Sequence, residues 1–135
     1  MTTQTVDQKR AQHALSKISN IKSKSCGHYV SYVSALPATV VMNGLGQALV
    51  TLLAKAGRKQ KPKEDPNYFL YEQVASWLSE QIQELNGDVD AVVEQLMQND
   101  QQIYLRAQAE SLAYIRWLKQ FARAYLTEPE GEQND

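Results

Sequence analysis

Hydrophobic residues recur along this chain at spacings of three and four, and no segment alternates between apolar and polar residues in steps of two. This periodicity is typical of helices that bury one face. The first helix is predicted from about Thr5 to Lys24. Its apolar flank consists of Ala11, Ala14, Leu15, Ile18 and Ile21. The pattern predicts an all-α protein.

Turn residues divide the first half of the chain. Residues 25–27 (Ser-Cys-Gly) mark a break, and a short helix is expected over about 28–35. Pro37 suits the first turn of a helix, because its missing N–H needs no partner there. We therefore expect a third helix to begin near Pro37 and to run to about Ala56. Gly57 follows, as is common just past a helix end.

The second half predicts three more helices. They span about 67–85, a short stretch after the N-cap candidate Asp88, and about 100–126. Before them, residues 57–66 hold two prolines and almost no apolar side chain, which predicts a solvated, mobile basic loop. Residues 127–135 are polar and acidic, which predicts a disordered tail. Residues 1–126 are thus expected to form a compact single-domain bundle of five to six helices.

Aromatic residues crowd the last predicted helix. Helical spacing places Tyr114, Phe121 and Tyr125 on one face with Ile103 and Leu118, and this face is expected to pack in the core. Trp117 lies off that face. A tryptophan outside the core face is a candidate for contact with a partner molecule.

Residues 25–54 contain no Asp, Glu, Lys or Arg, so a membrane span has to be weighed. Residues 38–54 number 17, at the lower edge of spanning length. Asn43, Gln47 and two glycines dilute their hydrophobicity, and we favour a buried central helix over a membrane span. Gly44 and Gly46 are interpreted as sites of close helix packing inside the bundle.

The net charge of −1 conceals a division of the chain into a basic and an acidic part. Residues 1–63 carry ten Lys and Arg against one acid, a charge of +9, and residues 64–135 carry 14 acids against four bases, a charge of −10. A polyanion or an acidic partner is attracted by the first part only. The alternatives are a basic face that serves protein contacts and a dipolar surface without a partner.

Three groups of cations are candidate contacts for a polyanion, and an RNA backbone is one example that proteins recognise through phosphates and shape. The alternative for each group is a solvated face that keeps the protein in solution. The first helix contributes Arg10, Lys17 and Lys24, with His13 between them. The loop contributes Arg58, Lys59, Lys61 and Lys63. The last helix contributes Arg116, Lys119 and Arg123 at spacings of three and four.

The residues offer little support for catalysis. The only histidines are His13 and His28, and Cys26 lies two positions before His28, on one local turn where a nucleophile and its base meet poorly. No spacing typical of metal ligands occurs, so we expect no enzyme, no metal site and no cofactor. A single cysteine excludes an intrachain disulfide and fits a reducing compartment, and the polar first residues lack a secretory signal. These features favour a cytoplasmic protein.

Several segments together resemble the small-subunit family of the type III-B CRISPR (Cmr) effector. The most characteristic is the run from Leu36-Pro37 to Asn43-Gly44-Leu45-Gly46-Gln47-Ala48-Leu49. The others follow in the same order as in the family. They are Arg10-Ala11, Tyr68, Leu70-Tyr71, Trp77-Leu78, Tyr104, Arg106, Ala109-Glu110, Trp117-Leu118-Lys119 and Phe121-Ala122. The resemblance covers roughly residues 8–126 and leaves out the acidic tail.

The resemblance implies a small helical subunit without catalytic residues. Such subunits assemble side by side into a minor filament, which runs along the subunits that hold the guide RNA and helps line the groove where guide and target RNA pair. The implied partners are other Cmr subunits, copies of the chain itself, guide RNA and target RNA, in antiviral defence. The opposite charges of the two parts suggest that copies stack head to tail. The alternative is a helical protein-interaction adaptor without a nucleic-acid role, and a third possibility is a small nuclease.

Overall fold

The computed structural model of the chain describes residues 3–21 and 28–126. These residues form α-helices and short 3-10 helices without a strand, which confirms the all-α prediction. The α-helices are α1 (Val6–Ile21), α2 (Tyr29–Asn43), α3 (Leu45–Gly57), α4 (Pro66–Gln81), α5 (Val92–Gln98) and α6 (Gln101–Tyr125). The 3-10 helices are η1 (Pro62–Glu64), η2 (Gln83–Leu85) and η3 (Val89–Ala91). Lys24, the predicted break at 25–27 and the predicted tail lie outside the described residues.

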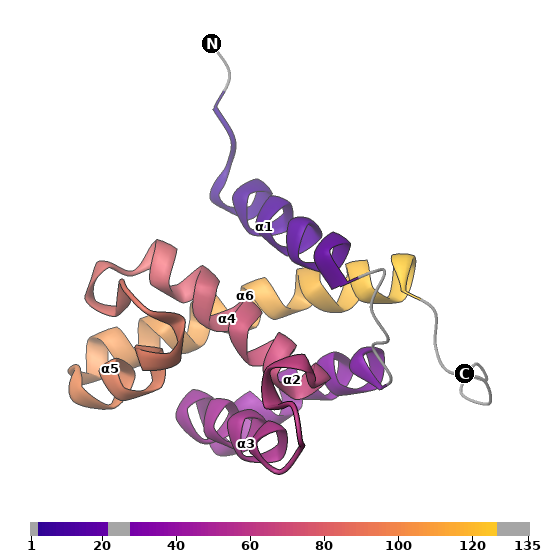
Figure 1. The fold of residues 1–135 in the computed structure, drawn as a ribbon. Helices are drawn as coiled ribbons and strands as arrows, with labels where there is room; N and C mark the ends of the chain where they lie inside the picture. Colours follow the sequence, from indigo (N-terminus) through magenta and orange to yellow (C-terminus); the bar gives the residue numbers. More distant parts are fainter. Residues whose placement is uncertain (1–2, 22–27, 127–135) are drawn as a thin grey trace.

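The long helix α6 is the centre of the bundle, and each of the other α-helices contacts it (Figure 1). α1 packs along the second half of α6, α4 crosses α6, α2 packs against it, and α5 lies against its beginning. The apolar faces that meet here form one core, which includes the fully buried Trp77, Tyr114, Ile115 and Leu118. Burial of such faces contributes most of the stability of a helical bundle.

The division between α2 and α3 differs from the prediction. α2 continues through Pro37, so the expectation that a helix begins there was wrong. A proline inside a helix costs about 3 kcal/mol, because one hydrogen bond is lost and the ring crowds the preceding turn. Val33, Leu36 and Val40 lie on the buried face on both sides of Pro37, and their packing offsets this cost.

The chain turns at Gly44 instead. Its backbone has φ +89° and ψ 155°, a combination that is open almost only to glycine. The turn leaves the first N–H groups of α3 without helical partners, and α6 supplies them: the Leu45 N–H donates to Gln108 Oε1 at 2.9 Å and the Gly46 N–H donates to the Tyr104 hydroxyl at 2.8 Å. Two side chains one turn apart on α6 thus hold the start of α3.

Gly46 is buried at the same contact, where a Cβ atom would overlap the methyl group of Met97. This confirms the interpretation of that glycine as a site of close packing.

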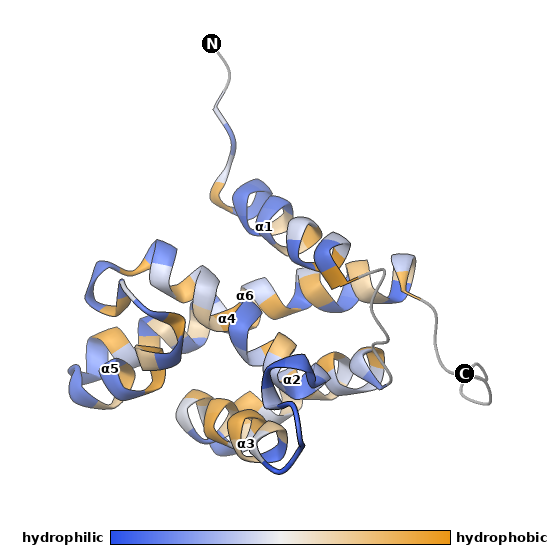
Figure 2. Cartoon of the chain, viewed as in Figure 1, coloured by the Kyte–Doolittle hydropathy of each residue, from blue (hydrophilic) through white to orange (hydrophobic). Residues whose placement is uncertain are grey.

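The turn at Gly44 divides the uncharged stretch between two helices, α2 and α3. In the described part of the chain, no helix combines the length and the apolar character that a membrane span requires. Figure 2 shows α3 mostly in hydrophobic colours and the segment after it in hydrophilic ones.

The segment 57–66 is exposed over most of its length, as predicted for a solvated loop, and it contains the 3-10 helix η1. Near its end the carboxylate of Asp65 accepts from the Asn67 N–H and caps α4. One predicted core position is corrected. Tyr125, predicted to lie in the core, is 50% exposed. Periodicity predicts the direction of a side chain, but not how far the neighbouring helices extend over it.

The turn at Gly44 generates a stability prediction. Gly44→Ala forces a side chain into a backbone conformation that it rarely adopts, and we expect the free energy of unfolding in urea to fall by about 1–3 kcal/mol. Gly57→Ala is the matched control, because Gly57 ends α3 with open space around it. We expect its unfolding free energy to stay the same or to rise by about 0.4–1 kcal/mol. Equal effects of the two substitutions would contradict this account of the turn.

Candidate nucleic-acid interface

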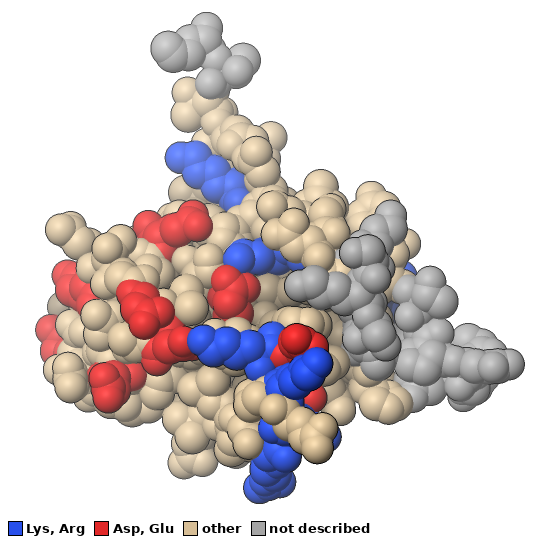
Figure 3. Space-filling model, viewed as in Figure 1, with Lys and Arg blue, Asp and Glu red and all other residues tan. Residues whose placement is uncertain are grey.

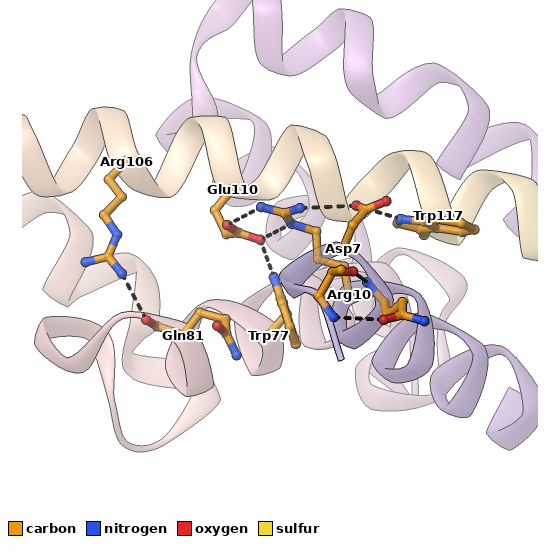
Figure 4. A network of polar contacts seen from close by, with 9 residues as sticks. Asp7, Arg10, Trp77, Gln81, Arg106, Glu110 and Trp117 are labelled. Carbon is orange, nitrogen blue, oxygen red and sulfur yellow. Dashed lines mark hydrogen bonds and ion pairs between the residues drawn. The ribbon is translucent and has the colours of Figure 1, made fainter. Parts of the chain in front are cut away.

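The carboxylate of Glu110 on α6 joins three helices (Figure 4). Arg10 on α1 donates to it from Nε at 2.5 Å and from Nη2 at 3.0 Å. Trp77 on α4 donates to the same carboxylate from Nε1 at 2.8 Å. The side chains of Arg10 and Glu110 are mostly buried, at 20% and 16% exposure. This bidentate salt bridge is therefore shielded from solvent. Arg10 therefore points into the bundle.

The environment of Glu110 favours its ionised form. Burial raises the pKa of this carboxyl, but the hydrogen bonds from Arg10 and Trp77 outweigh burial and leave the pKa below its ordinary value. Arg10 also donates to Asp7 at 3.1 Å, and Asp7 accepts from Trp117 Nε1 at 3.0 Å. A network of hydrogen bonds thus runs from Trp77 on α4 to Glu110 on α6. It continues through Arg10 and Asp7 on α1 to Trp117, again on α6.

His13 and Lys17, the next members of the predicted stripe on α1, also have partners within the molecule. Lys17 Nζ donates to Glu72 of α4 at 2.8 Å. His13 Nδ1 lies 2.6 Å from the Tyr114 hydroxyl, and its Nε2 lies 3.3 Å from Glu80. Burial lowers the pKa of His13 and favours the neutral ring. The two described cations of this stripe, Arg10 and Lys17, are thus joined to carboxylates of α6 and α4.

The cations of α6 have a different setting. Arg116 and Arg123 are exposed and Lys119 is half-buried, and within residues 3–21 and 28–126 no carboxylate forms an ion pair with any of them. α6 contains no acid after Glu110. Spacings of three and four bring the three side chains into one arc of the helix. We call them the α6 cation row, a group of cations that the carboxylates of the described residues do not pair.

The basic loop presents a second group of exposed cations. Arg58, Lys59 and Lys61 are exposed beside the end of α3. Lys63 donates to Asp90 at 3.2 Å and lies 5.7 Å from the centre of the Tyr68 ring, so it is partly used within the fold. The loop cations and the α6 cation row lie on different elements and do not share one helix face.

Acidic side chains gather at the end of the bundle that carries α5. In Figure 3 most of the red side chains lie at the end that carries α5, whereas the blue ones lie elsewhere on this face. The exposed acids between the end of α4 and the start of α6 are Glu80, Glu84, Asp88, Asp90, Glu94 and Asp100, and no Lys or Arg lies in that stretch. We call this group the acidic end.

Trp117 is half-buried on α6, where its ring stacks on Phe121 with 5.5 Å between the ring centres. It lines a groove together with Asp7, Arg116 and two further residues of α6. The sequence patterns did not single out Asp7 or Glu110 as partners of Trp117 and Arg10. Asp7 is the one acid of residues 1–63 and stands three positions before Arg10, which is a usable signal for the local pair.

The fold and this surface define a class of protein: a small all-α bundle that carries opposite charges at separate places and, among its described residues, no cluster of side chains fit to hold a metal ion. The model of the family described as "CRISPR-associated protein (Cas_Cmr5)" matches residues 6–125. The chain belongs to this family.

Two known proteins show the extent of the similarity. The chain is 27% identical over 138 residues to the CRISPR system Cmr subunit Cmr5 of Thermotoga maritima, a match that covers 100% of this chain and 93% of that protein. Its fold is similar to the crystal structure of a CRISPR-associated Cmr5 family protein from Thermus thermophilus, with a TM-score of 0.73 and 25% identity. That similarity covers 92% of this chain and 100% of the other.

The buried carboxylate predicts a pH-dependent contribution to stability. The pKa of Glu110 is lower in the folded chain than in the unfolded one, so its contribution is complete above the unfolded value of about 4.3 and is lost as the pH falls through the folded value. Glu110→Gln places an amide nitrogen, which cannot accept, beside Arg10 or Trp77. We expect the unfolding free energy at pH 7 to fall by about 1.5–3 kcal/mol.

Denaturation in urea at a series of pH values measures both effects. In Glu110→Gln the loss of stability below about pH 4.3 should be shallower than in the native chain. Glu94→Gln, which removes an exposed carboxylate on α5, is the control and should change stability at pH 7 by less than about 0.5 kcal/mol. A native acid profile in Glu110→Gln would show that this carboxylate does not carry the dependence.

Proposed function

We propose that the chain is a non-catalytic subunit of a Cmr complex that contacts the backbone of the guide and target RNA. The observation that carries this proposal is the α6 cation row, Arg116, Lys119 and Arg123, which lacks carboxylate partners among the described residues. Membership of the Cmr5 family supports assembly with other Cmr subunits, because the Thermotoga relative is named as a subunit of the Cmr system. The proposal places the chain in the cytoplasm, in antiviral defence.

Unpaired cations favour a polyanion for a physical reason. A cation that already has a carboxylate neighbour gains little from a phosphate, because the internal pair must first be broken or shared. Arg10 and Lys17 are in this situation, so we assign them to the fold and assign RNA contact first to the α6 cation row. Arg58, Lys59 and Lys61 are exposed and supply a second contact in the proposal.

The proposed role is positioning without chemistry. Arginine and lysine at fixed spacing hold sugar-phosphate chains by charge and shape, which suits an A-form duplex. His13 is engaged with Tyr114 and Glu80, and burial favours its neutral form. These contacts support a role for this histidine in packing α1 onto the bundle.

The acidic end and the exposed loop cations Arg58, Lys59 and Lys61 support a further part of the proposal, the stacking of copies into a filament. Lys63 of the same loop already pairs with Asp90 of the acidic end, so the attraction between copies falls to the other three loop cations. A contact between surfaces of opposite charge on successive copies is head to tail and repeats without closing. Monomeric behaviour at low salt, alone and with the other subunits, would count against stacking.

A second candidate, a protein-interaction adaptor without an RNA role, is favoured by exposed apolar side chains. Val41 and Met42 at the end of α2 are 67% and 80% exposed, and Met97 and Leu105 are each 53% exposed. Apolar groups on the surface are compatible with contacts to other subunits in either proposal. The RNA measurement below separates the two.

Charge reversal on α6 tests the RNA contact. In a Cmr complex assembled with R116E/K119E/R123E, we expect RNA retention to weaken by at least about tenfold near physiological salt. The slope of log affinity against log salt should become shallower by roughly 3, because each of the three cations would no longer neutralise a phosphate. Filter binding or fluorescence anisotropy over a salt series measures both quantities.

The matched control keeps the positive charges of the α6 cation row and exchanges lysine and arginine. R116K/K119R/R123K should retain RNA with a nearly native salt slope, because phosphate contact through charge tolerates exchange of Lys and Arg better than removal of the charge. Native retention and a native slope in the charge-reversed complex would remove the α6 cation row from the proposal and favour the adaptor.

A further inference from the structure

Three aromatic rings form a stacked row on the second half of α6. The ring centres of Trp117 and Phe121 are 5.5 Å apart with planes at 26°, and those of Phe121 and Tyr125 are 6.1 Å apart with planes at 21°. The three residues follow one another at a spacing of four, so the row runs along one side of the helix. Phe121 covers one side of the Trp117 ring.

The row of stacked rings ends at Trp117, because the position one turn earlier on α6 is an alanine. Ala113 lies one turn before Trp117, where a fourth ring would continue the row, and its side chain is a single methyl group. A groove of about 320 Å³ opens at this place, lined by Asp7, Ala113, Arg116, Trp117 and Gln120. Its size is at the lower end of the range for small-molecule sites in proteins.

The edge of the Trp117 ring is held in place by α1. The Trp117 N–H donates to Asp7 at 3.0 Å, and Arg10 donates to the same carboxylate oxygen at 3.1 Å (Figure 4). The pKa of Asp7 is lowered, first by the hydrogen bond from Trp117 and then by that from Arg10. A ring that is fixed at its edge and stacked on one side loses little freedom when a ligand stacks beside it.

We propose that this groove, which we call the Trp117 groove, binds an unpaired nucleobase of RNA, with the base stacked beside Trp117 and its phosphate held by Arg116. The inference rests on the proposed RNA contact and adds to it a place where a base, and not only the backbone, is bound. Every base presents a flat π face, so stacking on tryptophan tolerates any sequence. Gln120 supplies an amide that can donate to or accept from the edge of the base.

Charge complementarity favours a nucleotide over an apolar side chain of a partner protein. Arg116 borders the groove, and Lys119 and Arg123 follow it on the same arc of α6. The carboxylate in the groove, Asp7, is already engaged by Arg10 and by the ring of Trp117. A ligand that combines a ring with a negative charge therefore finds both complements at this place.

Two oligonucleotides that differ only in their bases test the Trp117 groove in the full-length chain. One is a single-stranded RNA hexamer, and the other is an abasic ribose-phosphate hexamer of equal charge. We expect the base-bearing hexamer to bind about tenfold more tightly at low salt. It should also quench the tryptophan emission, and Trp117 is the accessible reporter because Trp77 is only 2% exposed.

Two variants locate the preference. Trp117→Ala should bind the two hexamers equally, whereas Trp117→Phe, which keeps a ring for stacking, should retain most of the preference. Ala113→Phe fills the place of the proposed base with a ring of the chain itself, and it should remove the preference for the base-bearing hexamer. Circular dichroism of each variant verifies that the helical content is native.

The outcomes separate this inference from the proposed function. Equal affinity of the native chain for both hexamers, whether strong or undetectable, overturns the Trp117 groove as a base site, and so does a preference that survives in Trp117→Ala. If R116E/K119E/R123E binds neither hexamer, that result supports only the backbone contact of the proposed function. If Trp117→Ala instead releases the chain from the assembled complex without any base preference in the native chain, the groove is a protein contact and the inference fails.

Discussion

One carboxylate, that of Glu110 on α6, joins three helices, because it accepts hydrogen bonds from α1 and from α4. A charge at this depth is stabilised only when it is fully paired, and Arg10 and Trp77 provide that pairing. The contact sets α1 along the second half of α6. From there Asp7 reaches the indole N–H of Trp117. The geometry of the outer surface of α6 thus follows from an interaction inside the bundle.

The same contact explains which cations remain available. A stripe of bases on α1 suggests a binding surface, but Arg10 and Lys17 are used to attach α1 to α6 and α4. Most of the exposed acids among the described residues lie between the end of α4 and the start of α6, whereas α6 itself has no acid after Glu110. Charges of opposite sign that are kept apart do not neutralise each other, and each group can then attract a partner of its own.

The segment from Leu36 to Leu49, which contributes most to the resemblance noted in the sequence, has a structural role in this chain. Gly44 allows the turn between α2 and α3, and Gly46 allows α3 to approach α5 and α6. Tyr104 and Gln108 complete the turn by accepting from the first N–H groups of α3. A helix start without such acceptors would leave unpaired polar groups at a part-buried place, which is costly. In this chain the segment therefore serves the packing of α3 against α5 and α6.

The sequence by itself determined the all-α class, the approximate positions of the helices and the separation of charge, because helical periodicity, turn residues and formal charge are local properties. It also indicated that Trp117 lies off the core face. Only the tertiary structure decided that α2 continues through Pro37, that the chain turns at Gly44 and that Tyr125 is exposed. It also decided that Arg10 and Lys17 pair with carboxylates, whereas no carboxylate of residues 3–21 and 28–126 pairs with the α6 cation row. The physical reason is the same for each of these: the cost of a proline, the freedom of a charge and the burial of a ring depend on which other helix lies against them, and that helix is distant in the sequence.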